Sequence, residues 1–396
     1  MKKTAVNVVK FVVTFGILYL MFKKFQIGFD DISTAISTSK AEWFVVSILT
    51  QVAAITFSIF RWRVLLVAQG LNVPISHVIK TYLVGRFLGT FTPTGLGLEA
   101  YKAYDIARYT QRGAPSVTVV FVEKFLTLLA LSILMLITLP MVQLNTAFIG
   151  AFFIFFLVVL LILLILIFKA SILLNIVRIL PFTDKTEGPA NKAVESFQTF
   201  KNRKGAMGAA IIFGVLVYIS LFSTFFTNGM ALRIGGAQPG ELYSITSSEK
   251  TKETLANMNI QWIKQNDAEN ERLEVFLTDS ESEALIARDI DMTLVSDDKY
   301  TRKGLGLGDV LTVGPLTQIA TMIPLSIAGI GLREGAFIGL LRSKGVWVAQ
   351  RAVLAATMWY FVSISVNIFG AIIFLTRRTD YHTKISKEEF QRVTKS

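Results

Sequence analysis

The stretch IPLSIAGIGLREGAF, from Ile323 to Phe337, places a proline, three glycines and an adjacent arginine–glutamate pair inside an apolar region. Proline and glycine interrupt helices, and charged side chains are costly inside a bilayer. A second stretch, TPTGLGLEAYKAY from Thr92 to Tyr104, has the same order of residue types: proline, Gly-x-Gly-Leu, then glutamate. The two stretches predict helices that are broken at membrane depth beside charged side chains.

The rest of the chain is apolar enough for a membrane protein. Of its 396 residues 53% are hydrophobic, and the mean hydropathy is +0.55. A helix needs about 20 apolar residues to cross the hydrocarbon core. The first apolar run lacks a small-residue cleavage site, so we expect a retained helix and not a removed signal peptide. The predicted spanning helices are Ala5–Phe22, Trp43–Phe60, Ser116–Thr138, Thr146–Phe168, Met207–Met230 and Val346–Leu375.

Charge is distributed unevenly along the chain. The net charge is +12, yet 14 of the 28 acidic residues lie between Glu241 and Gly304, with 8 basic residues. A basic chain often binds nucleic acid, but in a membrane protein lysine and arginine gather in cytoplasmic loops. We therefore expect no nucleic-acid partner. The chain has no cysteine, which excludes disulfides and thiolate metal sites.

The basic segments predict the topology. Lysine and arginine are concentrated in Lys169–Lys204, at Arg61 and Arg63, and in the tail from Arg377, so these parts are expected in the cytoplasm. Counting helices between them places the N- and C-termini in the cytoplasm and the acidic segment outside. The stretches His77–Gly113 and Gly306–Lys344 must then each begin and end on one side, which is the inside for the first and the outside for the second.

The predicted fold is an all-α polytopic protein of the cell membrane, built as an inverted repeat of helices with two opposed re-entrant hairpins broken by proline and glycine. Paired broken segments of this kind mark a substrate site near the bilayer midplane. Residues 1–240 hold the first repeat and helices four and five of the membrane domain. Residues 305–376 hold its second hairpin and last helix, and residues 377–396 form a basic cytoplasmic tail.

Residues 241–304 are predicted as a polar, acidic extracytoplasmic insert, either a small α/β domain or partly disordered. RLEVFL at residues 272–277 and DMTLVS at 291–296 have strand character, and SESEALIARDI at 280–290 reads as a helix between them. Such an insert is suited to docking on the cavity mouth or on an extracytoplasmic partner. The sequence does not indicate an oligomeric state.

PLSIAGIGLREGAF, RWRVLL at residues 61–66 and the Pro–Gly–Gly–acid segment near residue 95 resemble the flippase-type membrane domain of lysylphosphatidylglycerol synthases. The resemblance covers most of residues 1–240 and 305–376. It implies a polytopic protein that moves, or helps to move, an anionic or isoprenoid-linked lipid between leaflets. The synthases continue into a large aminoacyl-transfer domain, whereas 21 residues follow Leu375 here, so we expect no lysyl transfer. Gly97-Leu98-Glu99 stands where the family more often has Gly-Gly-acid, and Lys102 where it often has arginine.

The candidate substrate-binding residues are those of the two broken segments and the charges nearest to them. Arg333 is expected to contact a phosphate through its bidentate fork, with Glu334 orienting it. The alternative is a helix start, where glutamate favours the dipole and arginine reaches the interface. The full set is Arg333, Glu334, Gly329, Gly331, Pro324, Glu99, Lys102, Pro93, Gly95, Gly97, Arg86, Glu123 and Lys124.

The remaining charges have structural alternatives. Glu99 and Lys102 are three residues apart and can pair with each other on one helix face. Adjacent residues on a helix point apart, so Glu123 and Lys124 need different partners. Arg86 is expected to face the cavity. Arg61 and Arg63 are interpreted as orientation signals, and Asp309 as the cap of a helix in the second hairpin.

The sequence favours transport over chemistry. His77 and His382 lack a partner at ligand spacing, so no metal is expected. The segment Gly304–Asp309 lacks the Lys-Ser/Thr of a nucleotide loop, so no cofactor is expected either. The predicted function is a flippase for an anionic phospholipid or a polyprenyl-phosphate-linked lipid, without enzymatic activity. Two alternatives stay open: a membrane-embedded enzyme acting on a lipid-linked phosphate, and a non-transporting scaffold or regulator.

Overall fold

A computed structural model describes the chain in twelve segments. Within them, the helices long and apolar enough to cross a membrane are Ala41–Ala68, Gly113–Met141, Lys204–Ala231 and Ala352–Thr376, which supports a multi-pass membrane location. These four match predicted spans, Thr146–Phe168 is helical as well, and the predicted span Ala5–Phe22 lies outside the described residues. The structure describes residues 37, 39–90, 96–141, 146–168, 199–200, 203–234, 238–258, 260–266, 271–295, 300–322, 331–347 and 350–376.

The described residues divide into two compact units, each named here after a buried cation. The Lys102 unit takes residues from Gln51–Ile137, Ala147–Leu221 and the chain from Ser363 onward. The Arg333 unit takes the chain up to Thr50, residues from Thr138–Thr146, and Phe222–Val362. Helices α3 (Ala41–Ala68), α10 (Lys204–Ala231) and α15 (Gln350–Thr376) contribute residues to both units. Each unit contains one of the two motif stretches that the sequence singles out.

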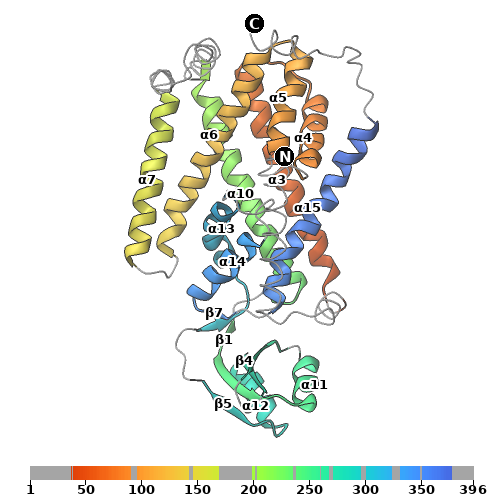
Figure 1. Ribbon diagram of the computed structural model, residues 1–396, viewed down its shortest axis with the longest axis vertical. Coiled ribbons are helices and arrows are strands. Elements are labelled where there is room, and N and C mark those ends of the chain that lie inside the picture. Colours follow the sequence, from red (N-terminus) through yellow and green to blue (C-terminus); the bar gives the residue numbers. More distant parts are fainter. Residues whose placement is uncertain are drawn as a thin grey trace, which may run out of the picture. The chain divides into compact units, whose positions relative to one another are not determined.

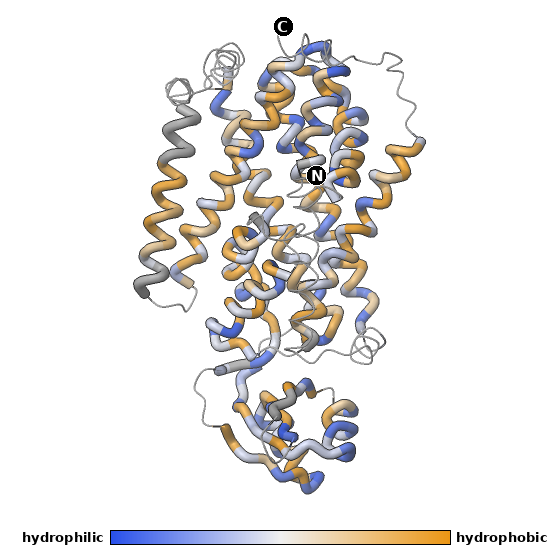
Figure 2. Tube along the Cα trace, viewed as in Figure 1, coloured by the Kyte–Doolittle hydropathy of each residue, from blue (hydrophilic) through white to orange (hydrophobic). Residues whose placement is uncertain are grey.

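The secondary structure of the Lys102 unit consists of helices joined by short turns in its described residues. Apolar residues run along α6 and α7 (Figure 2), and on α7 many of them are exposed, among them Phe153, Ile154, Phe155 and Val158, as expected for a helix that faces lipid. The buried core of the unit gathers around Trp62, Leu65, Leu126 and Val122. The elements are α3 (Ala41–Ala68), α4 (Ile75–Thr90), α5 (Leu96–Thr110), α6 (Gly113–Thr138), α7 (Thr146–Phe168), α10 (Lys204–Ala231) and α15 (Gln350–Thr376) (Figure 1).

The first predicted hairpin is the helix pair α4 and α5, which pack against each other. The helices have 16 and 15 residues, too few to cross about 30 Å of hydrocarbon at 1.5 Å per residue. Gly85 permits their close approach, because a Cβ there would lie 2.9 Å from Leu98 Cδ1 and 3.2 Å from its carbonyl oxygen. Their length fits a re-entrant hairpin, which remains a prediction.

The Arg333 unit holds a second short helix pair, α13 (Leu307–Met322) and α14 (Leu332–Ser343), of 16 and 12 residues. The two helices pack together. Asp309 is the third residue of α13, and its Oδ2 accepts from the N–H of Gly306, the residue before the helix, at 3.0 Å. It therefore caps the helix start from within the first turn and not from the predicted N-cap position. The predicted span Val346–Leu375 is wrong at its start. Val346 and Trp347 form strand β7, and α15 begins at Gln350, because β7 pairs with the strand that leads out of the insert.

The insert is an ordered α/β structure in its described residues. Strand β4 alternates: Leu273, Val275 and Leu277 join a buried core with Leu255 and Leu285 of the two insert helices. Phe276 faces the other way and stacks on Trp347. The predicted strands and helix are confirmed by β4, β5 and α12. The elements are β2 (Glu241–Thr246), α11 (Glu249–Asn257), β3 (Trp262–Asn266), β4 (Glu271–Leu277), α12 (Asp279–Ile286) and β5 (Met292–Leu294) (Figure 1).

The four insert strands form one antiparallel sheet in the order β3-β4-β2-β5. A second sheet of two-residue strands joins the insert to the helices. In it β1 (Gln238–Pro239) pairs antiparallel with β6 (Arg302–Lys303), and β6 pairs parallel with β7 (Val346–Trp347). The chain therefore enters and leaves the insert through neighbouring strands. The remaining described element is the 3-10 turn η2 (Leu139–Met141).

Candidate functional site

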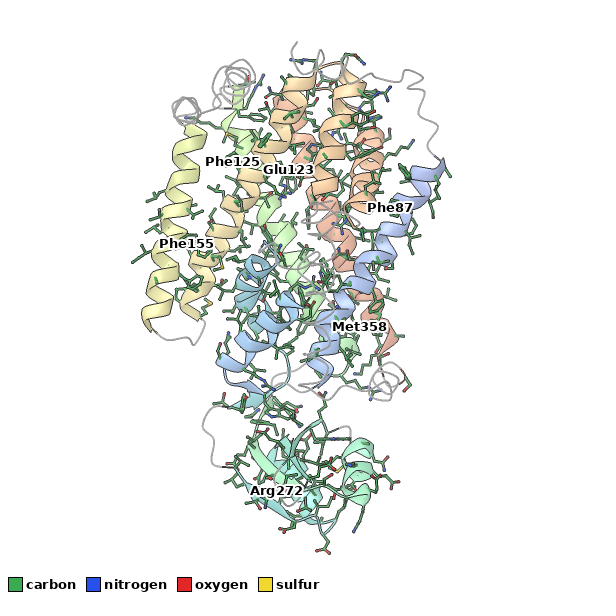
Figure 3. The ribbon with its side chains drawn as sticks, in the orientation of Figure 1. Phe87, Glu123, Phe125, Phe155, Arg272 and Met358 are labelled. Atoms are coloured by element: carbon green, nitrogen blue, oxygen red, sulfur yellow. The ribbon has the colours of Figure 1, made fainter. Side chains whose placement is uncertain are left out.

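Lys102 of α5 is the centre of a buried ionic cluster in its unit. Its side chain is 1% exposed, and the ammonium donates to Glu123 of α6 and, at 3.2 Å, to Glu99 one turn earlier on α5. Figure 3 marks Glu123 on α6, where the side chain is 4% exposed. The pairing of Glu99 with Lys102 that the sequence left open is present, and a second carboxylate from another helix joins it.

Arg61 of α3 completes the cluster, although its position in the sequence predicted only an orientation signal. Its guanidinium is buried, and Nη2 donates to Glu123 Oε1 at 3.0 Å. Glu123 thus holds two cations, one through each carboxylate oxygen. The exposed Lys124 instead reaches Glu99 at 3.2 Å. The prediction that Glu123 and Lys124 need different partners is confirmed.

Aromatic rings cover the buried ammonium. Lys102 Nζ lies 4.9 Å from the centroid of Trp62 and 5.6 Å from that of Tyr82. The negative face of an aromatic ring attracts a cation, and the attraction is stronger where water is excluded. The rings therefore offset part of the cost of burying the ammonium.

The cluster has more positive charge and more donors than its own carboxylates use. It contains three cations, Arg61, Lys102 and Lys124, and two acids, Glu99 and Glu123. Among the described residues, the buried Nε and Nη1 of Arg61 and Nε1 of Trp62 have no hydrogen-bond partner. Buried polar groups are nearly always paired in native structures. Unpaired donors beside an excess positive charge are suited to an anion.

Arg333 is the corresponding cation of the other unit. Arg333 is 3% exposed and Glu334 is fully buried. The guanidinium turns onto the neighbouring carboxylate, with Nη2 at 2.7 Å and Nε at 3.2 Å from Glu334 Oε1. The other oxygen of Glu334 accepts from Gly331 N–H at 2.6 Å. Glu334 therefore has the helix-start role that the sequence offered as an alternative, and it also orients Arg333.

Gly331 is required by its backbone conformation. Its φ is +84°, a region that residues with a Cβ rarely adopt. This conformation lets α14 begin directly after it and aims its N–H at Glu334. The glycine is thus one condition for placing the Arg333–Glu334 pair at the first turn of the helix.

An aromatic box surrounds Arg333 as well. The guanidinium carbon lies 4.1 Å from the ring centroids of both Trp359 and Tyr360 on α15, and 5.3 Å from that of Phe225 on α10. Within the described part of the chain, Trp359 Nε1 and the Tyr360 hydroxyl are buried without a hydrogen-bond partner. This site shares its composition with the first: a buried cation, a carboxylate, aromatic rings and unpaired donors.

Arg86 of α4 lies outside the Lys102 cluster. Its Nε donates to Asn367 Oδ1 at 3.1 Å and its Nη2 to Ser363 Oγ at 3.3 Å, both on α15. Asn367 also donates to Thr90 at 3.0 Å. These contacts fasten α4 to the last helix. The geometry therefore gives Arg86 packing partners, and its predicted role towards a cavity stays a prediction.

A histidine and several glycines and prolines were also singled out by the sequence. His77 has a close acidic neighbour, with Nε2 2.8 Å from Asp105 Oδ2, which the spacing along the chain did not indicate. No group of three metal-ligating side chains occurs among the described residues. Gly97 lies half-buried at the start of α5. Pro93, Gly95, Pro324 and Gly329 lie outside the described residues.

The aromatic residues at both sites were not predicted from the sequence; they are Trp62, Tyr82, Phe225, Trp359 and Tyr360. An aromatic residue in an apolar helix is usually interpreted as facing lipid or as part of the core. The hydrophobic periodicity of the helix therefore does not indicate that a cation lies beside it. The one usable signal was local. RWR at residues 61–63 and MWYF at 358–361 place polar-tipped rings in the middle of apolar runs.

Comparison with known families identifies the amino-terminal part of the chain. The family described as lysylphosphatidylglycerol synthase TM region matches residues 7–239. The match includes every residue of the Lys102 cluster and ends just before the insert. Arg333 and its hairpin lie beyond the matched residues. No curated protein matches the chain significantly.

Proposed function

The chain belongs to the family of the lysylphosphatidylglycerol synthase transmembrane region, and from this premise we propose that it moves an anionic phospholipid or a polyprenyl-phosphate-linked lipid between leaflets. The family relationship supports a multi-pass membrane protein concerned with lipids. The step from lipid handling to lipid translocation rests on the two buried cation sites. We assign no catalytic step to the chain.

The observation that carries the proposal is the unpaired donors beside each buried cation. Arg61 and Trp62 in one unit, and Trp359 and Tyr360 in the other, offer N–H and O–H groups that no described residue accepts from. A phosphate has several acceptor oxygens and a negative charge, so it satisfies both needs at once. In a region of low effective dielectric such contacts are stronger than in water.

The carboxylates give the sites a way to release what they bind. Glu123 holds Lys102 and Arg61, and Glu334 holds Arg333, whenever no headgroup is present. A phosphate that enters competes with the carboxylate for the same cation. Binding is thereby weakened enough to be reversible, which transport requires. The topology predicted from the sequence assigns the two motif stretches to opposite sides of the membrane, so that each site serves one leaflet.

Lipid scrambling in proteoliposomes tests the proposal. Labelled phosphatidylglycerol, a labelled polyprenyl phosphate and labelled phosphatidylcholine are placed in both leaflets, and an impermeant quencher reports the fraction that reaches the outer leaflet with time. We expect the parent protein to accelerate movement of an anionic lipid over protein-free vesicles. Arg333→Ala should abolish this, Arg333→Lys should weaken it because the planar fork is lost, and Lys102→Arg should retain it.

Lys80→Ala serves as the control, because Lys80 is exposed on α4 and belongs to neither site. Size-exclusion elution and helical circular dichroism establish that each variant is folded. A folded Arg333→Ala protein that moves lipid at the parent rate would contradict the headgroup role of Arg333. The ionic pairs would then be purely structural.

A further inference from the structure

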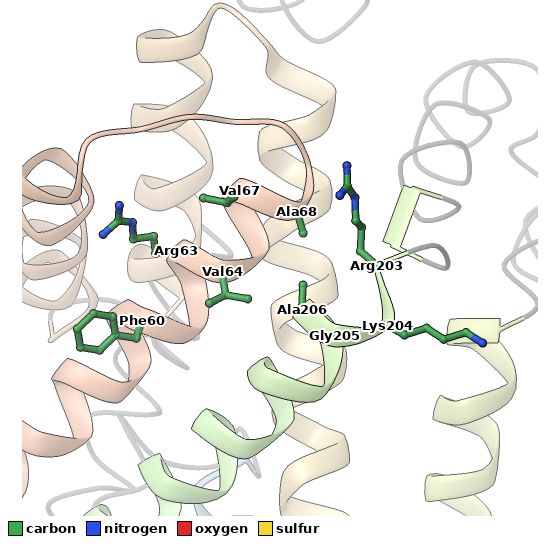
Figure 4. A pocket seen from close by; sticks show the side chains of 9 residues that line it. All are labelled: Phe60, Arg63, Val64, Val67, Ala68, Arg203, Lys204, Gly205 and Ala206. Carbon is green, nitrogen blue, oxygen red and sulfur yellow. The ribbon is translucent and has the colours of Figure 1, made fainter.

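A groove of about 650 Å³ lies between the last turns of α3 and the first turn of α10, both within the Lys102 unit. Its apolar wall includes Phe60, Val64 and Val67, and its basic residues are Arg63, Arg203 and Lys204. Figure 4 shows Gly205 and Ala206 opposite Val64 and Ala68, with Arg63 on one side and Arg203 and Lys204 on the other. The groove thus combines an apolar wall with a cationic rim.

The rim is available to a ligand. Arg203 and Lys204 are exposed and Arg63 is half-buried. Within the part of the chain that the structure describes, their side chains make no ion pair or hydrogen bond. A Cβ at Gly205 would meet nothing within 4 Å, so the side of α10 that faces the groove is open. No acid among the described residues pairs with any of these three cations, unlike Lys102 and Arg333.

The apolar wall is equally uncovered. Phe60 is 42% exposed and Val67 is 51% exposed, and both stand on a helix that is apolar and long enough to span a bilayer. A soluble anion would leave this wall in contact with water or lipid tails. A ligand with an acyl chain next to its negative charge covers both parts of the groove. The combination therefore favours a lipid over free phosphate.

We propose that this groove holds an anionic phospholipid of the surrounding leaflet. Its phosphate lies at the rim formed by Arg63, Arg203 and Lys204, and an acyl chain runs along Phe60, Val64 and Val67. Basic pockets between membrane helices recognise anionic headgroups in this way, and the cytoplasmic leaflet, where the sequence places both helix ends, carries such lipids. The site is separate from the Lys102 cluster and needs no lipid movement to be occupied.

Spin-label electron paramagnetic resonance on the reconstituted full chain tests the proposal. Phosphatidylcholine bilayers carry a trace of spin-labelled phosphatidylglycerol or spin-labelled phosphatidylcholine, and the immobilised fraction gives the relative association of each lipid. We expect the parent to prefer phosphatidylglycerol. Removing each rim cation should lower the preference by about fivefold if each contributes as a basic residue near a membrane surface does. The variant Arg63→Gln/Arg203→Gln/Lys204→Gln should therefore show no preference.

Two comparisons separate a seated lipid from general attraction to a basic protein. Lys40→Gln/Lys80→Gln/Lys250→Gln removes the same charge from exposed positions outside the groove and should keep the preference. Val67→Trp keeps every charge but fills the apolar wall, and it should lose most of the preference. If Val67→Trp binds like the parent, or if the control triple variant loses the preference equally, the groove is not a lipid site.

Soluble glycerol phosphate distinguishes the two sources of the phosphate. It lacks an acyl chain, so it should not displace labelled phosphatidylglycerol at concentrations that leave the bilayer intact. Displacement that depends on Arg63 and Arg203 would show a site for a soluble anion and overturn the lipid assignment. None of these measurements depends on lipid transport. Their outcome therefore tests the groove separately from the proposed function.

Discussion

The ammonium of Lys102 on α5 donates to the carboxylate of Glu123 on α6, and these side chains are 1% and 4% exposed. A pair of charges buried to this degree is costly to form and more costly to break from one side, because the partner is left uncompensated. The arrangement therefore ties the first hairpin to a spanning helix. In the proposed function, a lipid phosphate competes with Glu123 for this cation.

Glu123→Gln should destabilise the protein strongly. Glutamine keeps the shape of the side chain but leaves Lys102 and Arg61 without their shared anion, and breaking a buried pair in this way costs about 3–5 kcal/mol. Thermal unfolding in detergent measures the effect. Adding Lys102→Met to Glu123→Gln should restore part of the loss, since one of the two cations that lost Glu123 is then removed while Arg61 remains.

Lys124→Gln is the matched control for this experiment, because Lys124 follows Glu123 on α6 and is 57% exposed. Exposed ion pairs contribute about 0–1 kcal/mol, so little change is expected. Equal stability of Glu123→Gln and the parent would show that the cluster is not what holds α5 to α6.

Gly331→Ala should destabilise α14, and Gly335→Ala should not. Gly331 has φ +84°, and a Cβ in the left-handed region costs roughly 1–2 kcal/mol. Gly335 lies in the same helix, and a Cβ there would meet nothing within 4 Å. Alanine at that position therefore gains helix propensity. The melting temperatures of the two variants should move in opposite directions, and a Gly331→Ala protein as stable as the parent would refute the backbone argument.

The insert should lose stability in acid through Glu281. Burial acts to raise the pKa of this carboxyl, but the hydrogen bonds from Lys303 and from the Thr278 N–H outweigh it and the net pKa is lowered. A carboxyl whose folded pKa lies below its unfolded value stabilises the fold above the unfolded pKa. That contribution is lost as the pH falls through the folded pKa.

Hydrogen exchange of the β4 amides in the full chain measures this dependence. Protection should fall as the pH drops below the ordinary range of a glutamate, after correction for intrinsic exchange. In Glu281→Gln the fall should be smaller, whereas Glu283→Gln, an exposed position on the same helix, should behave as the parent. An unchanged profile in Glu281→Gln would show that the Lys303 and Thr278 contacts contribute nothing to the insert.

The sequence was sufficient to predict the long helices of the described residues, the two short helix pairs, and the insert elements β4, β5 and α12, whereas β2, β3 and α11 were not predicted. Hydropathy and residue alternation depend on neighbours along the chain, so α6, α10 and β4 are readable from local pattern. The start of α15 was predicted incorrectly because Val346 and Trp347 form strand β7, which pairs with β6. In this pair Val346 lies opposite Arg302, a residue 44 positions earlier in the chain. No local pattern reports such a contact.

The charges of the candidate site were predictable, but their partners were not. An arginine or glutamate in an apolar run is conspicuous because burying its charge in the membrane costs free energy. This is how Arg333, Glu334 and Glu123 were identified. Arg61 was missed because it stands at a basic helix end, where arginine usually marks orientation. The rings of Trp62 and Tyr360 were missed since only the fold brings them to a cation.

Transport by Tyr360→Phe tests the central claim most directly. The variant removes one buried hydroxyl that has no hydrogen-bond partner among the described residues and lies on the ring beside Arg333. If that hydroxyl serves only the fold, its loss is neutral or stabilising and transport is unchanged. If it donates to the phosphate, the rate of phosphatidylglycerol movement in proteoliposomes falls on the order of tenfold, as for a lost hydrogen bond to a charged group. We predict the slower rate with an unchanged or higher melting temperature, and transport at the full parent rate would contradict the assignment of the unpaired donors to a lipid headgroup.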